Sequence, residues 1–115
     1  MLNVTVEMSK WLRGTQPSYL LDVESGRMCC LGFVCLAVGL AERSIRNKRS
    51  IACVSQSAAL PPALEKLYSS DNRCDSDVAE QLMMINDELE VPDTERCAKL
   101  VRVSKEAEIA FTFVP

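Results

Sequence analysis

An uncharged apolar run, Met28–Leu40, constrains the fold of this 115-residue chain more than any other feature. A helix that crosses a bilayer needs about 20 apolar residues, so this run of 13 residues is too short. It follows a polar, charged segment and therefore does not have the position of a secretion signal. We expect the run to be buried, with the amphipathic remainder of the chain packed around it.

The pattern within this run predicts a short extended segment that leads into a helix of the hydrophobic core. Apolar residues at i, i+3, i+4 and i+7 give one helical face, formed by Leu31, Val34, Cys35 and Val38. Gly39 stands where a C′ glycine would end this helix in a left-handed turn. Gly32 leaves room for another backbone to approach closely.

A small antiparallel sheet is expected next to this helix. Tyr19–Asp22 and Met28–Leu31 have strand character, and Glu24–Arg27 has turn chemistry, so residues 19–31 predict a hairpin. Residues 109–114 are β-branched and aromatic, with Ile109, Phe111 and Phe113 alternating to one side. We expect this C-terminal strand to add to the hairpin, because a lone strand cannot satisfy its backbone.

The other segments are mainly helical by pattern. Residues 4–13 predict a short amphipathic helix, although the alternation of residues 2, 4, 6 and 8 leaves a strand start open. Further helices are expected from the Pro61-Pro62 pair to about residue 68, from a cap at Asp75 or Ser76 to about 89, and over about 94–106. Within the less regular segment 41–57, residues 51–54 suit a short strand or a buried loop. The predicted fold is one α+β domain, residues 1–115, with four or five helices.

Charge is distributed unevenly along the chain. Residues 1–57 carry seven Lys/Arg against four Asp/Glu, and residues 58–115 carry six against twelve. This indicates an acidic face in the second half, either a solvated helical surface or a docking surface for a basic partner. The candidate docking residues are Glu80, Asp87 and Glu88. The acidic balance argues against direct nucleic-acid binding, which needs clustered cations.

A basic cluster at residues 43–49 leaves two interpretations open. Arg43, Arg46, Lys48 and Arg49 suit either a solvated loop or a contact with an anionic partner. Asn86-Asp87 is similarly open: it suits either a polar helix end or a pair that binds the backbone of a loop.

The residue content excludes several chemistries. The chain has six cysteines and no histidine, so Ser-His and Cys-His nucleophile pairs and imidazole metal sites are absent. There is no Cys-x-x-Cys pair for zinc and no glycine-rich phosphate loop. We expect reduced cysteines, several of them buried as small hydrophobes, no cofactor, no metal and no enzymatic activity.

One anion-binding arrangement can be assembled from the sequence. A helix that begins near Cys30–Gly32 would offer free amide donors to an anion. Arg27 precedes them, and Arg13 and Tyr19 are expected as neighbours across the hairpin. The alternative is that Arg27 is a solvated turn residue and the cysteines belong to the core.

Several segments together resemble a group of small bacteriophage and prophage proteins marked by a Cys-Cys-Leu-Gly core. The segments are Lys10–Gly14, Ser18–Leu21, Gly26–Phe33, Asp77–Met83 and Ile85–Asp87, which span most of the chain. The resemblance implies a phage accessory protein in the host cytoplasm, but it supplies no catalytic residues.

Two functions follow as hypotheses. The first is a non-enzymatic protein that binds and inhibits a host defence component, in the manner of an anti-CRISPR, through its acidic surface. The alternative is a small-molecule binder that sequesters a signalling nucleotide, a small anionic ligand, near Arg27. In either case we expect a monomer or homodimer with no membrane association.

Overall fold

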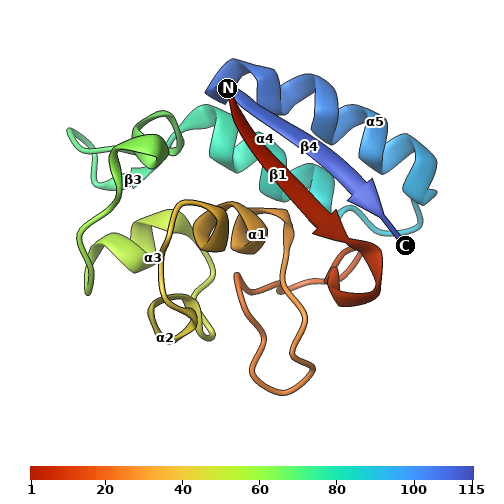
Figure 1. The fold of residues 1–115 in the computed structure, drawn as a ribbon, viewed down its shortest axis with the longest axis horizontal. Coiled ribbons are helices and arrows are strands. Elements are labelled where there is room, and N and C mark those ends of the chain that lie inside the picture. The colour runs from red at the N-terminus through yellow and green to blue at the C-terminus, as the bar shows by residue number, and fades with distance from the viewer.

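The first and last strands of the chain form a two-stranded parallel sheet. In the computed structural model, which describes all 115 residues, β1 (Leu2–Glu7) pairs with β4 (Ile109–Val114), with Leu2 opposite Ile109 and Glu7 opposite Val114. Figure 1 shows the two strands side by side, with the termini at opposite ends of the pair. The α+β class is as predicted, but the predicted antiparallel sheet of residues 19–31 and 109–114 does not form. The antiparallel pairing in this structure is a short one between residues 68–69 and 74–75.

The predicted helix over residues 4–13 is also wrong, and the strand alternative holds. Val4 and Val6 are buried while Thr5 and Glu7 are exposed, which is the period of two that a one-sided strand requires. A short 3₁₀ helix, η1 (Met8–Lys10), follows directly. On the partner strand, the inward alternation predicted for Ile109, Phe111 and Phe113 is confirmed.

Residues 19–31 fold back on themselves but form no strand pair. The Asp22 amide donates to the Arg27 carbonyl at 2.8 Å, and the Cys29 amide donates to the Tyr19 carbonyl at 3.1 Å. The Gly26 amide also donates to the Asp22 carbonyl within the turn. Four further backbone bonds of this segment run outward: Leu20 to Lys48, Leu21 to Asn47, and Met28 to both Lys10 and Leu12. The hairpin prediction failed because segments 10–12 and 46–48 take the hydrogen bonds that a ladder would need.

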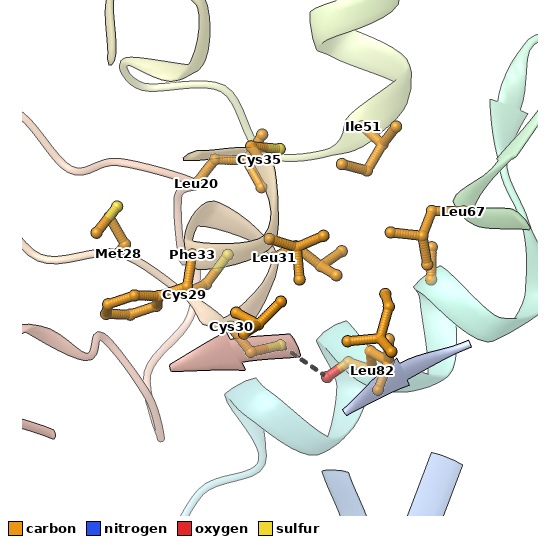
Figure 2. Close-up of a cluster of buried hydrophobic side chains, with 14 of the residues drawn as sticks. Leu20, Met28, Cys29, Cys30, Leu31, Phe33, Cys35, Ile51, Leu67 and Leu82 are labelled. Atoms are coloured by element: carbon orange, nitrogen blue, oxygen red, sulfur yellow. Dashed lines mark hydrogen bonds between the residues drawn. The ribbon is translucent and has the colours of Figure 1, made fainter. Parts of the chain in front are cut away.

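The core helix forms as predicted, as α1 (Cys30–Ala37). A Cβ atom at Gly32 would lie 1.9 Å from the carbonyl oxygen of Leu20, so only glycine allows this approach of two backbones. Gly39 has φ +96 just after the helix, as predicted for a C′ glycine. Figure 2 shows side chains of α1 among buried residues of other elements, including Ile51, Leu67 and Leu82.

The remaining elements surround this helix. They are α2 (Glu42–Ile45), α3 (Ile51–Ser55), η2 (Pro62–Leu67), β2 (Tyr68–Ser69), β3 (Cys74–Asp75), α4 (Asp77–Asp87), α5 (Asp93–Ser104) and η3 (Lys105–Ala107). Residues 51–54 are helical rather than a strand or loop, because the Ser50 hydroxyl caps the helix by accepting from the Cys53 amide. Ser76 caps α4 in the same way, as predicted.

The helices meet on both sides of α1. This helix contacts β1, α2 and α4, while α4 contacts α5 and α5 contacts β4. In Figure 1, α2 and α3 lie at the end of the molecule opposite α5. None of the helices combines the length and the apolar character that crossing a membrane requires.

Candidate functional site

An open surface depression of about 580 Å³, which we call the acidic hollow, brings acidic and apolar side chains together. Its lining residues are Gln16, Pro17, Ser18, Arg49, Asp75, Glu80, Met83, Met84 and Asp87. This set contains three carboxylates, of Asp75, Glu80 and Asp87, and one guanidinium, of Arg49. The hollow is therefore a net acidic surface with an apolar portion.

One face of α4 forms a wall of the hollow. Glu80, Met83, Met84 and Asp87 are spaced at i, i+3, i+4 and i+7, so the helix repeat places them on the same side. A different face of α4, with Ala79, Leu82 and Asn86, is buried in the core. The helix therefore presents its lining residues from a fixed position.

Asp87 joins this wall to the loop that forms the opposite side. Its Oδ1 accepts from the Ser18 hydroxyl at 2.6 Å and from Asn86 Nδ2 at 2.9 Å. Ser18 is buried, and its neighbours Gln16 and Pro17 are exposed in the hollow. The shape of the hollow thus depends on a hydrogen bond between residues distant in sequence.

Asn86 lies beneath the hollow and bonds in four directions. Its Oδ1 accepts from the Trp11 indole Nε1 at 2.8 Å and from the Cys30 amide at 2.9 Å. Its Nδ2 donates to the Leu12 carbonyl at 3.0 Å, as well as to Asp87. Asn86 therefore binds backbone groups of other segments, as one interpretation of Asn86-Asp87 expected, whereas Asp87 accepts only from side chains. The other interpretation, a polar helix end, also holds, because α4 ends at Asp87.

The end of α4 and the connection that follows it are tied to α5 by a buried arginine. Arg96 Nη1 donates to the carbonyls of Ile85 and Asn86, and Nη2 donates to the Val91 carbonyl. These bonds satisfy carbonyls at the C-terminal end of α4 that have no partner within the helix. Arg96 was not singled out from the sequence, because nothing in the local pattern separates it from an exposed charge.

The carboxylates of the hollow have different environments. Asp75 is half-buried and accepts from the Ala52 amide at 2.8 Å; burial raises the pKa of its carboxyl, and the nearby charge of Glu80 adds to this shift. Glu80 is exposed and forms no ion pair. Glu80 is therefore the carboxylate most open to a partner.

Arg49 is the only cation in the lining, and it is not neutralised there. No carboxylate lies within ion-pair distance of its guanidinium, which is placed 6.0 Å from the centre of the Tyr19 ring. Two other exposed arginines of the basic cluster, Arg43 and Arg46, also lack ion pairs.

The structure brings two of the three predicted acidic residues together. Glu80 and Asp87 line the hollow, whereas Glu88, just past the end of α4, faces Lys99 of α5 at 3.7 Å. Sequence reasoning missed Asp75 and Met84. The helical spacing from Glu80 was the available signal for Met84; Asp75 has no such signal, because it precedes the helix.

The predicted anion-binding arrangement does not form. The amides of Cys30–Gly32 are buried, and that of Cys30 is already bonded to Asn86. Arg13 is held by Asp93 at 2.7 and 3.2 Å and lies 4.9 Å over the Trp11 ring. Tyr19 faces Arg49, and Arg27 is exposed in the turn. The proposed nucleotide site near Arg27 therefore has no geometric basis.

The three cysteines of α1 and its cap belong to the core, as predicted. Burial raises the pKa of the Cys29 and Cys35 thiols to about 12 and that of Cys30 well above its usual value. The Cys30 thiol contacts the Leu82 carbonyl at 3.8 Å (Figure 2). No three Cys, Asp or Glu side chains are grouped so as to hold a metal ion.

Comparison with known proteins identifies none that is similar to this chain. No family model matches the chain, and neither the curated proteins nor the solved structures give a match.

Proposed function

We propose that this chain is a non-enzymatic binding protein whose acidic hollow engages a basic partner, and that the partner is a host defence component. The observation that carries the proposal is the composition of the hollow, with three carboxylates against one guanidinium. Complementary charge speeds encounter with an oppositely charged partner and excludes wrong ones. The resemblance to small phage proteins supports the host setting.

Occlusion would act by steric and electrostatic competition. Defence effectors that act on nucleic acid present Lys and Arg to phosphates, so an acidic surface on a small protein can occupy the same cations. The rigid attachment of α4 and the loop at residues 16–18 supports this mode, because preformed binding surfaces lose less entropy on association.

The test uses a charge reversal at the most open carboxylate. Glu80→Arg changes a residue whose side chain makes no hydrogen bond or ion pair within the chain, so folding should be unaffected. Glu65→Arg is the matched control: Glu65 is also exposed and unpaired but lies outside the hollow. Tagged proteins are used for affinity capture from host lysate, with mass spectrometry to identify what binds.

We expect the wild type and Glu65→Arg to capture the same host protein and Glu80→Arg to lose it. Strains that each carry one defence system then show whether the captured component is inhibited, scored as recovery of phage plaques. Capture of identical proteins by wild type and Glu80→Arg would contradict a role for the hollow. Capture without recovery of plaques in the matching strain would contradict the defence assignment.

A further inference from the structure

Met84 gives the acidic hollow an apolar contact that its carboxylates do not explain. It is 73% exposed, although it lies in the middle of α4. Glu80 and Glu88 lie one turn to either side of it, so the core does not reach this position. Single exposed apolar residues are ordinary, but this one continues into Met83 and Pro17 within one depression.

The mixture of apolar surface and carboxylates restricts the chemistry of an occupant. Anions are repelled by the carboxylates, and a purely ionic partner leaves the apolar part in contact with water. An apolar partner without charge would leave Asp75 and Glu80 desolvated and unpaired. Methionine side chains adapt to varied apolar shapes and occur often at binding surfaces.

We infer that the acidic hollow takes a basic amphipathic segment of a partner protein, with a Lys or Arg side chain at Glu80 and Asp75 and an aliphatic or aromatic side chain on Met84. This rests on the proposed function and specifies its partner. Glu80 and Met84 are four residues apart on α4, so their contacts on the segment are about 6 Å apart, one turn of a helix. Arg49 is the only cation in the lining and repels the cation of the partner, so its removal should tighten binding.

Three designed peptides of about 18 residues, long enough to hold a helix, test the inference. One is an amphipathic Lys/Leu helix; the second replaces every Leu by Ser; the third replaces every Lys by Glu. Isothermal titration calorimetry measures binding to the wild type and to Glu80→Gln, Met84→Ser, Arg49→Ala and the control Glu65→Gln. All four positions are exposed, and unchanged thermal unfolding confirms that each variant is folded.

We expect the Lys/Leu peptide to bind and the Glu/Leu peptide not to bind. Glu80→Gln should weaken Lys/Leu binding by about 2- to 5-fold, the scale of one exposed ionic contact. Met84→Ser should weaken it by about 5- to 10-fold, the scale of one or two buried methylene groups. Arg49→Ala should strengthen it by about 2- to 5-fold, and Glu65→Gln should have no effect. The Lys/Ser peptide should bind more weakly and be insensitive to Met84→Ser.

The inference would be overturned by no binding of the Lys/Leu peptide, or by binding that Met84→Ser and Glu80→Gln leave unchanged. Equal affinity for the Lys/Leu and Lys/Ser peptides would also overturn it, because the apolar contact would then contribute nothing. Failure of the proposed function looks different. In that case the peptides behave as expected, while host capture or plaque recovery does not depend on Glu80.

Discussion

Replacing Asn86 by alanine tests whether the hydrogen bonds beneath the hollow stabilise the fold. Asn86 is fully buried, and its Oδ1 is the acceptor for both the Trp11 indole and the Cys30 amide. Trp11 and Cys30 are themselves fully buried, so water cannot replace the lost acceptor without opening the core. The Leu12 carbonyl loses its donor in the same variant.

The expected loss follows from the number of groups left without a partner. A buried donor without an acceptor costs about 1–3 kcal/mol, so the two donors together predict about 2–6 kcal/mol, with a central value near 4. Asp87 adds little, because Ser18 still donates to it and its side chain is partly exposed. The Leu12 carbonyl is left out of this sum because Leu12 is partly exposed. Such a loss is large against the ~5–15 kcal/mol that holds a small domain folded.

Urea unfolding followed by far-UV circular dichroism measures this change. Gln81→Ala is the matched control, because Gln81 is exposed on the same helix and should shift the free energy of unfolding by no more than about 0.5 kcal/mol. Trp11 is the only tryptophan, so its emission reports directly on the loss of the indole hydrogen bond. A loss below about 1 kcal/mol for Asn86→Ala would refute the reasoning, because it would show that neither donor depends on this acceptor.

Three further outcomes are expected. Gly32→Ala should destabilise the fold by at least about 3 kcal/mol in urea unfolding, because the added Cβ meets backbone atoms. Gly26→Ala has open space around it and should lose about 1–2 kcal/mol from its positive φ alone. Equal losses in the two variants would contradict the packing argument. The Arg13 guanidinium lowers the pKa of Asp93, so this pair stabilises the fold above the ordinary carboxyl pKa and loses that contribution as the pH falls through the lowered folded value. Asp93→Asn should therefore lose less stability on acidification than the wild type. An unchanged dependence of the free energy of unfolding on pH would contradict a stabilising role for the pair. In thiol labelling at mildly alkaline pH, exposed Cys74 should react first. The three core thiols, Cys29, Cys30 and Cys35, should react only after unfolding, and labelling of any of them in the folded protein would contradict their burial.

The features that the sequence predicted correctly are set by neighbouring residues. The apolar period from Leu31 places α1, and Gly39 ends it where a left-handed residue is needed. Ser76 begins α4 because a hydroxyl there accepts from an amide three residues on. Residues 109–114 form a strand because β-branched and aromatic residues alternate along it.

The features that the sequence did not predict depend on which of several distant segments forms a given hydrogen bond. Residues 4–8 fit both the predicted helix over 4–13 and a strand, and the choice is made by pairing with β4. Residues 19–31 have hairpin character, but segments 10–12 and 46–48 bond to them instead. The acidic site was predicted in part for the same reason: helical spacing unites Glu80 with Asp87, whereas Glu88 is drawn to Lys99 by the packing of α5.

The pairing of β1 with β4 has a consequence for synthesis on the ribosome. β1 leaves the exit tunnel long before its partner strand has been translated. Until then, its amide and carbonyl groups bond to water or make transient contacts. Parallel pairing between the two ends of a chain also requires closing a loop that spans nearly all of it, which is entropically slow. We therefore expect the sheet to form only after β4 has been translated, and α1, α4 and their local contacts to form earlier. During that interval, the unpaired edge of Leu2–Glu7 is the segment of the nascent chain most open to pairing with another polypeptide.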